Sequence, residues 1–227
     1  MKYETLFFDA DQTLFDFEKS ERTAFERTML SYGIQYDEQV HLGAYQEIND
    51  AIWKELELGK ITQEALKSER FRRFLKQLQL DFDAEEFART YEEQLADTSF
   101  LYEGSAELIE RLHQSRRLVL LTNGLALVQN RRIRKSEIGE YFDDIIISEE
   151  VGVSKPNPAI FELACRHLQN ADKRKILMVG DSLTSDIQGG INFGIDTCWY
   201  NPAHNRNTKG IRPTYEIGSM QKLYDII

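Results

Sequence analysis

Two aspartates near the start of the chain carry the clearest indication of chemistry. Asp9 and Asp11 follow a short apolar and aromatic run at residues 3–8, which is typical of a buried strand. In extended backbone, side chains two residues apart share a face, so these carboxylates repel unless a cation or a proton intervenes. The pair points to a metal site, to acid–base chemistry, or to both. On its own, the segment also fits an ordinary aspartate-rich turn in which Thr13 satisfies backbone donors.

Two further apolar runs end in polar residues that phosphate chemistry uses. Thr122 and Asn123, a hydroxyl and an amide, follow the run 118–121, and Asp181 follows the run 176–179. Parallel strands that are buried on both faces read as continuous apolar runs, and ligands of such sheets bind at the carboxyl ends of the strands. We therefore expect these side chains to gather beside the first aspartate pair.

A lysine follows another predicted strand, 145–147. Lys155 stands in the segment 154–158, where two prolines stiffen the approach to a helix and fix the direction of the ammonium group. Asp186 lies within the helical turn that follows Asp181. Each segment alone is a common turn, surface loop or helix cap. Their occurrence in order, each at or just beyond a strand end, indicates a site.

The elements that must position these residues alternate between strand and helix patterns. The strand-like runs are 3–8, 118–121, 145–147, 176–179 and 197–200. The helical patterns between them are 106–112, 128–138, 160–168 and 187–193. This alternation predicts right-handed crossovers and an α/β fold with a doubly wound parallel sheet, a Rossmann-like core.

Residues 18–98 show helical periodicity and no convincing strand. Two of their amphipathic segments stop at Gly33 and Gly59, and two begin at Thr62 and Asp83, which are typical end and start signals. Four amphipathic helices joined by short loops predict an inserted four-helix bundle with its own core. The expected domains are an α/β catalytic core at 1–15 with 101–227, and the helical insertion at 16–100.

Composition limits the classes of partner. The chain has 227 residues and a formal net charge of -10, which argues against a nucleic-acid polymer or an anionic membrane as the main partner. No apolar run is long enough to span a membrane. Asp9 and Asp11 interrupt the first apolar run, so we expect no signal peptide, which would have a basic segment followed by an uninterrupted apolar one. Cys165 and Cys198 have no pairing pattern, so we expect buried thiols in a reducing cytoplasm.

The ordered motifs resemble those of the haloacid dehalogenase-like hydrolase superfamily. The resemblance spans residues 3–200 and is carried by Asp9-x-Asp11-x-Thr13, Thr122-Asn123, Lys155, and Gly180-Asp181 with Asp186. The helical block resembles the cap that many members carry between the first two motifs. The segment 180–186 and the length of the cap are similar to those of the noncanonical pyrimidine nucleotidases.

The resemblance implies a mechanism and a cofactor. Asp9 would attack phosphorus and form an aspartyl-phosphate, while Asp11 would protonate the leaving alkoxide and later take a proton from water. Mg²⁺ would be bound by a carboxylate oxygen of Asp9, the backbone carbonyl of Asp11, and Asp181.

The resemblance also assigns the groups around the phosphate. Thr122, Asn123 and Lys155 would hold phosphoryl oxygens, and Lys155 would offset the carboxylate repulsion around Asp9. The residues expected behind these groups are Thr13, Ser182 and Asp186. For Asp186 two roles stay open, orienting Lys155 or a metal-bound water and capping a helix.

Aromatic and basic residues near these motifs have two interpretations each. Phe15 is the candidate for substrate contact because its position is tied to Asp11. Tyr45 and Trp53 could stack on a nucleobase, but their helical spacing favours the bundle core. The basic run 131–135 is interpreted as a solvated helix face and not as a nucleic-acid patch.

The sequence thus predicts a cytoplasmic, Mg²⁺-dependent phosphomonoesterase that acts on a small phosphorylated metabolite, by resemblance a nucleoside 5′-monophosphate. An acid two residues after the nucleophile separates it from the dehalogenases, which have no alkoxide to protonate. The alternatives are a sugar-phosphate phosphatase or a phosphomutase of the β-phosphoglucomutase kind. In a different class stands a non-catalytic interaction protein that kept the fold, which we would expect to have lost the nucleophile or the lysine.

Overall fold

The computed structural model describes residues 2–169 and 171–227, and the chain divides into two compact units. The sheet unit holds Met1–Phe17 and Ser99–Ile227, and the helical unit holds Glu18–Thr98.

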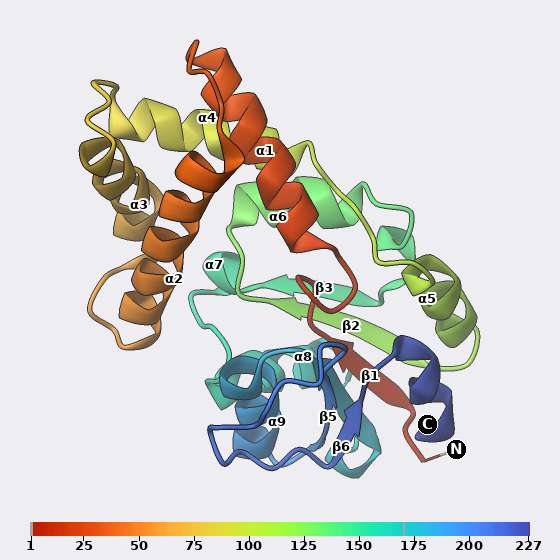
Figure 1. Cartoon of the computed structure of the whole chain (residues 1–227). Coiled ribbons are helices and arrows are strands. Elements are labelled where there is room, and N and C mark those ends of the chain that lie inside the picture. Colours follow the sequence, from red (N-terminus) through yellow and green to blue (C-terminus); the bar gives the residue numbers. More distant parts are fainter. Residues whose placement is uncertain (1, 170) are drawn as a thin grey trace. The chain divides into compact units, whose positions relative to one another are not determined.

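A parallel sheet forms the centre of the sheet unit (Figure 1). In the described residues it has six strands in the order β3-β2-β1-β4-β5-β6. Their bounds are β1 Thr5–Phe8, β2 Arg117–Thr122, β3 Asp144–Ile147, β4 Ile176–Gly180, β5 Asp196–Tyr200 and β6 Tyr215–Ile217. The order runs outward from β1 in both directions, so the predicted doubly wound sheet is confirmed. Strand β6 was not predicted, because three residues are too few to show a period.

Helices cover both faces of this sheet (Figure 1). Their bounds are α5 Ser105–His113, α6 Ala126–Arg134, α7 Ser148–Val151, α8 Pro158–His167 and α9 Gln188–Phe193. Short helical turns lie at Gly139–Tyr141, Lys173–Lys175, Leu183–Ile187 and Met220–Asp225. Along β1, Leu6 and Phe8 pack in one apolar cluster with residues of α5, whereas Phe7 packs in a second cluster with residues of α8. Because both faces are apolar, the strands appear in the sequence as continuous apolar runs.

Four α-helices make up most of the helical unit. They are α1 Phe17–Ser31, α2 Gly43–Glu57, α3 Gln63–Gln77 and α4 Ala84–Ala96, with a π-helical turn at Glu38–Leu42. The predicted start signals are confirmed, since Thr62 accepts a hydrogen bond from the backbone of Ala65 and Asp83 accepts one from Glu86. The rings of Phe25 and Tyr45 stack with centroids 4.7 Å apart. Tyr45 is therefore a core residue.

The structure also bears on two expectations from composition. Cys165 and Cys198 are both buried and free, as expected. Within the ranges that the structure describes, every helix is too short or too polar to cross a lipid bilayer.

The core of the helical unit contains a buried acid. Glu21 is 5% exposed and accepts a hydrogen bond from Nε2 of Gln46 at 2.9 Å. Burial raises the pKa of Glu21, and the bond from Gln46 only partly opposes the shift. An acid whose pKa is raised by folding stabilises the fold below its unfolded pKa, and this contribution is lost as pH rises through the folded pKa.

We therefore expect Glu21→Gln to gain stability relative to the wild type as pH rises from about 4 to about 8. The urea midpoint, measured at several pH values for both proteins, checks this. Glu26→Gln is the matched control, because Glu26 is exposed on the same helix. A difference between Glu21→Gln and the wild type that does not vary with pH would contradict the assignment.

Candidate active site

The loop after β1 carries the first two aspartates. The backbone N–H of Asp9 donates to the carbonyl of Val179 at 2.9 Å, so pairing with β4 continues to this residue. Backbone hydrogen bonds to the carbonyl of Ala10 then fold the loop back. Gln12 has a φ of 62°, a left-handed conformation that costs a non-glycine residue about 1–2 kcal/mol. Its Oε1 accepts a hydrogen bond from the Tyr102 hydroxyl at 2.6 Å, which helps to hold the loop in this shape.

Lys155 lies among the buried carboxylates. Its Nζ is 2.6 Å from Oδ1 of Asp9 and 2.7 Å from Oδ1 of Asp186, and it donates to the carbonyl of Leu121 at 2.6 Å. Burial acts to lower the pKa of Lys155, but Asp186 and Asp9 outweigh it and hold the pKa above its usual value. The side chain therefore remains a buried cation that balances two anions.

Asn123 fixes the backbone of this lysine. Its Nδ2 donates to the carbonyl of Lys155, and its Oδ1 accepts from the N–H of Lys155, both at 2.9 Å. The structure gives the Asn123 side chain a positioning contact, where the sequence predicted a contact with phosphate. Thr122 ends β2 as expected, and its hydroxyl accepts hydrogen bonds from the Gly124 N–H at 3.2 Å and from Nε2 of Gln129 at 2.9 Å.

The segment after β4 brings further carboxylates to the same place. The Thr13 hydroxyl lies 3.2 Å from Oδ2 of Asp9 and 3.4 Å from Oδ1 of Asp181. The N–H of Ser182 donates to Oδ2 of Asp186 at 3.0 Å. Both roles left open for Asp186 are seen: its Oδ1 contacts Lys155, and its Oδ2 accepts from the N–H of Ser182, which caps the helical turn Leu183–Ile187. One oxygen each from Asp9, Asp181 and Asp186 lie within 4.8 Å of one another.

A glycine makes this arrangement possible. A Cβ atom at Gly180 would lie 2.3 Å from Oδ2 of Asp186, closer than any non-bonded contact allows. The backbone of β4 and the Asp186 carboxylate can therefore meet only with glycine at this position.

The acidic cluster fits a hard divalent cation. Burial raises the pKa of Asp9 well above its usual value, although Lys155 opposes the shift. Burial and then the Asp186 carboxylate raise the pKa of Asp181 to about 7. A bound cation relieves such repulsion, and carboxylate and carbonyl oxygens are the ligands that Mg²⁺ takes. Both oxygens of Asp186 already accept hydrogen bonds, from Lys155 and from the N–H of Ser182. The carboxylates of Asp9 and Asp181, with the carbonyl of Asp11 that the resemblance implies, are therefore the groups that would hold the ion.

The Asp11 side chain is bound by two residues of α6 that the sequence analysis missed. Its carboxylate accepts hydrogen bonds from Nε2 of Gln129 at 2.6 Å and from Nη1 of Arg132 at 2.8 Å. The interpretation of residues 131–135 as a solvated face is wrong for Arg132, which is 1% exposed. Helical phase could have revealed this, because Arg132 follows the buried Val128 by one turn of the helix.

Two aromatic residues, Phe15 and Trp199, contact residues of the candidate site. Phe15 is fully buried in the apolar cluster of the sheet unit, so the expected contact with substrate is replaced by a packing role. The guanidinium carbon of Arg132 lies 5.6 Å from the centroid of the Phe15 ring. Trp199 on β5 was not predicted, and its indole N–H donates to the carbonyl of Asp181 at 2.7 Å. The apolar pattern of a buried strand does not indicate which residue a tryptophan N–H will bind, so this contact could not be predicted.

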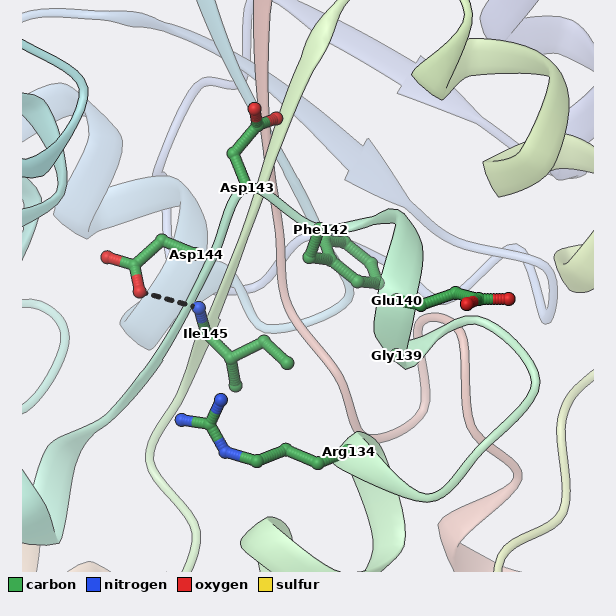
Figure 2. A pocket seen from close by; sticks show the side chains of 7 residues that line it. All are labelled: Arg134, Gly139, Glu140, Phe142, Asp143, Asp144 and Ile145. Atoms are coloured by element: carbon green, nitrogen blue, oxygen red, sulfur yellow. Dashed lines mark hydrogen bonds between the residues drawn. The ribbon is translucent and has the colours of Figure 1, made fainter.

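A separate hollow of about 290 Å³ lies elsewhere in the sheet unit (Figure 2). It is lined by Arg134, Gly139, Glu140, Phe142, Asp143, Asp144 and Ile145. Asp144 begins β3, so the hollow lies at the amino end of that strand. Ligands of doubly wound sheets bind at the carboxyl ends, where Asp9 and Asp181 are found. We therefore keep the strand-end cluster as the candidate site.

The topology and the strand-end residues agree with the hydrolase class that the sequence suggested. Residues 3–194 match the sequence model of a protein family described as haloacid dehalogenase-like hydrolase, and the chain belongs to that family. It is 37% identical over 228 residues to pyrimidine 5′-nucleotidase PynA of Streptococcus pneumoniae, covering 100% of this chain and 96% of that protein. It is 34% identical to pyrimidine 5′-nucleotidase YjjG of Escherichia coli, covering 100% and 99%.

A solved structure extends the similarity to the fold. The HAD-hydrolase YfnB of Bacillus subtilis, determined with bound magnesium, superposes with a TM-score of 0.93 at 34% sequence identity. The match covers 100% of this chain and 99% of that one. Its authors describe an interdomain movement in YfnB.

Lys155→Met should destabilise the protein. Without the ammonium, Asp9 and Asp186 are left as buried carboxylates with no cation, so we expect a loss of about 3–5 kcal/mol in the free energy of unfolding without divalent ions. Urea denaturation measures this. Lys54→Met, at an exposed position, is the control, and adding Asp186→Asn to Lys155→Met should recover part of the loss. A Lys155→Met protein as stable as the wild type would show that the buried cluster does not need this charge.

Asp181→Asn should remove most of the stabilisation by Mg²⁺. At a free concentration of a hundred times its Kd, an ion that binds only the folded state adds about 2.7 kcal/mol. We expect Mg²⁺ to raise the melting temperature of the wild type and of the control Asp50→Asn, whose side chain is exposed. Thermal melts with and without Mg²⁺ measure the difference. An undiminished shift in Asp181→Asn means that Asp181 is not a ligand.

Proposed function

We propose that this protein is a Mg²⁺-dependent phosphomonoesterase that hydrolyses pyrimidine nucleoside 5′-monophosphates. One observation carries the proposal: Nζ of Lys155 lies 2.6 Å from Oδ1 of Asp9, beside the acidic cluster that Asp9 shares with Asp181. A carboxylate nucleophile next to a fixed cation is suited to attack on a phosphoryl group. The substrate class is supported by similarity along the whole chain to PynA and YjjG, two pyrimidine 5′-nucleotidases.

In the first step an oxygen of Asp9 attacks the phosphorus of the substrate. An aspartyl-phosphate forms as the bond from phosphorus to the leaving oxygen breaks, and Asp11 gives its proton to that oxygen. The hydroxyl of Thr122 binds a phosphoryl oxygen. Lys155 has three N–H donors, and Asp9, Asp186 and a backbone carbonyl already accept from it. It therefore acts on the phosphoryl group chiefly through its charge.

In the second step water attacks the phosphorus of the aspartyl-phosphate. Asp11, now without its proton, takes one from this water. The bond between phosphorus and Asp9 breaks, which releases inorganic phosphate and restores the carboxylate. Mg²⁺ held by Asp9, Asp181 and the carbonyl of Asp11 would neutralise charge on the phosphoryl oxygens. The helical unit is assigned the role of cap that the sequence predicted.

A substrate panel tests this proposal. We expect purified protein with Mg²⁺ to release phosphate from pyrimidine nucleoside monophosphates with a higher kcat/KM than from purine nucleotides or sugar phosphates. Asp9→Asn should lower the rate by more than about 10⁴-fold, while Asp50→Asn should not.

The alternatives predict other results. A preference for sugar phosphates would overturn the substrate class but not the mechanism. Dependence on a bisphosphate activator, with an isomerised product, would identify a phosphomutase. Full activity of Asp9→Asn would show that Asp9 is not the nucleophile, and no turnover of any phosphomonoester would favour a non-catalytic protein.

A further inference from the structure

Two buried polar side chains of α6 bind the carboxylate of Asp11. Nε2 of Gln129 donates to Oδ2 at 2.6 Å, and Nη1 of Arg132 donates to Oδ1 at 2.8 Å. The same Arg132 nitrogen also donates to Oε1 of Gln129 at 3.1 Å. Each oxygen of Asp11 thus has a partner on one helix, and the two partners bind each other. This double attachment fixes the plane of the carboxylate as well as its position.

Gln129 also connects Asp11 to Thr122. Its Nε2 donates to the Thr122 hydroxyl at 2.9 Å. A primary amide has two N–H donors, and here they serve two residues with different roles in the proposed mechanism, phosphoryl contact and proton transfer. The amide therefore sets the spacing between these two groups.

Burial makes this arrangement rigid. Arg132 and Gln129 are each 1% exposed, whereas the Asp11 side chain is 26% exposed. The guanidinium carbon lies 5.6 Å and 5.3 Å from the ring centroids of Phe15 and Phe17, close enough for cation–π attraction. A buried guanidinium is costly unless its donors are bound. Oδ1 of Asp11 accepts from Arg132 and can do so whether or not Oδ2 carries the proton, while the Asp11 side chain remains accessible to a ligand.

The turn before α6 is fitted to the same side chain. A Cβ atom at Gly124 would lie 2.4 Å from Nε2 of Gln129. Alanine there would have to push the amide away from both of its acceptors. The glycine after Thr122 and Asn123 thus leaves room for Gln129 to reach Asp11.

We infer that Gln129 and Arg132 are positioning residues, which hold the Asp11 carboxylate in the rotamer from which it transfers a proton to the leaving oxygen. The inference rests on the proposed function, in which Asp11 protonates the alkoxide. Without these partners Asp11 can occupy other rotamers, and a displacement of about 1 Å at a reacting group lowers rates by about 10²-fold.

Two leaving groups distinguish this role from simple support of the fold. Nitrophenolate leaves p-nitrophenyl phosphate with little need of a proton, whereas the alkoxide of uridine 5′-monophosphate needs one. We expect Arg132→Met to lower kcat/KM for the nucleotide by roughly 10- to 100-fold, and for p-nitrophenyl phosphate by less than about threefold. Asp11→Asn should show the same selectivity. Both changes remove the same function, protonation of the leaving oxygen by Asp11. Adding Arg132→Met to Asp11→Asn should therefore cause no further loss of kcat/KM for the nucleotide.

Matched variants complete the test. Arg134→Met removes an exposed arginine from the same helix and should leave both kcat/KM values unchanged. Arg132→Lys keeps the charge on a shorter and more flexible side chain, so it should restore only part of the loss. If Arg132→Met does not fold, Gln129→Leu carries the comparison, with Gly124→Ala as an independent way to displace the amide.

The outcomes separate the two proposals. Equal losses on both substrates in Arg132→Met and Gln129→Leu, with Asp11→Asn still selective, would overturn the inference and leave the proposed function standing. If the wild type hydrolyses p-nitrophenyl phosphate but not the nucleotide, the substrate class is wrong, and the alkyl phosphate that it hydrolyses best takes the nucleotide's place. A wild type that hydrolyses neither, or an Asp11→Asn variant without selectivity, would overturn the phosphatase mechanism and the inference with it.

Discussion

The site depends on one buried ammonium group. Nζ of Lys155 contacts Asp9 at the end of β1, the carbonyl of Leu121 in β2, and Asp186 beyond β4. Two unit charges 4 Å apart interact with about 4 kcal/mol at an effective dielectric constant of 20, so the lysine offsets a large repulsion between the acids. It also joins segments that are far apart in sequence. Lys155 therefore both balances the charge of the carboxylates and holds the ends of β1 and β2 and the segment after β4 together.

The two aspartates in the loop after β1 are kept from repelling each other because each is paired with a cation. Asp9 is paired with Lys155, and Asp11 is paired with Arg132. Each carboxylate thus has its own cation, supplied by a different element of the sheet unit. In the proposed mechanism, this separation allows Asp9 to face the metal site while Asp11 is held for proton transfer. Two neighbouring carboxylates that would repel each other can therefore both be accommodated in the folded protein.

Much of this could be predicted from the sequence, because the sheet is buried on both faces and its strands end abruptly in polar residues. That pattern made Asp9, Thr122 and Asp181 candidates. Lys155 became a candidate because prolines fix its loop. Each of these signals is local, and each depends on a strand end or a turn.

The remaining features depend on contacts between distant segments. The side chain of Asn123 binds the backbone of Lys155, 32 positions along the chain, and no local pattern reveals such a partner. Arg132 was hidden among basic neighbours, although helical phase places it on the buried face. Phe15 was expected at the substrate because it is near Asp11 in sequence, but its ring packs inward. Proximity along the chain does not determine the direction of a side chain.

The most direct test of the central claim, that the strand-end cluster accepts a phosphoryl group, is a crystal structure with Mg²⁺ and beryllofluoride, which mimics a phosphoryl group on a carboxylate. The account predicts beryllium bonded to a carboxylate oxygen of Asp9, with Lys155 and the Thr122 hydroxyl close to the fluorines and Asp181 on the metal. Beryllofluoride bound to another carboxylate, or a magnesium ion that Asp181 does not contact, would contradict it.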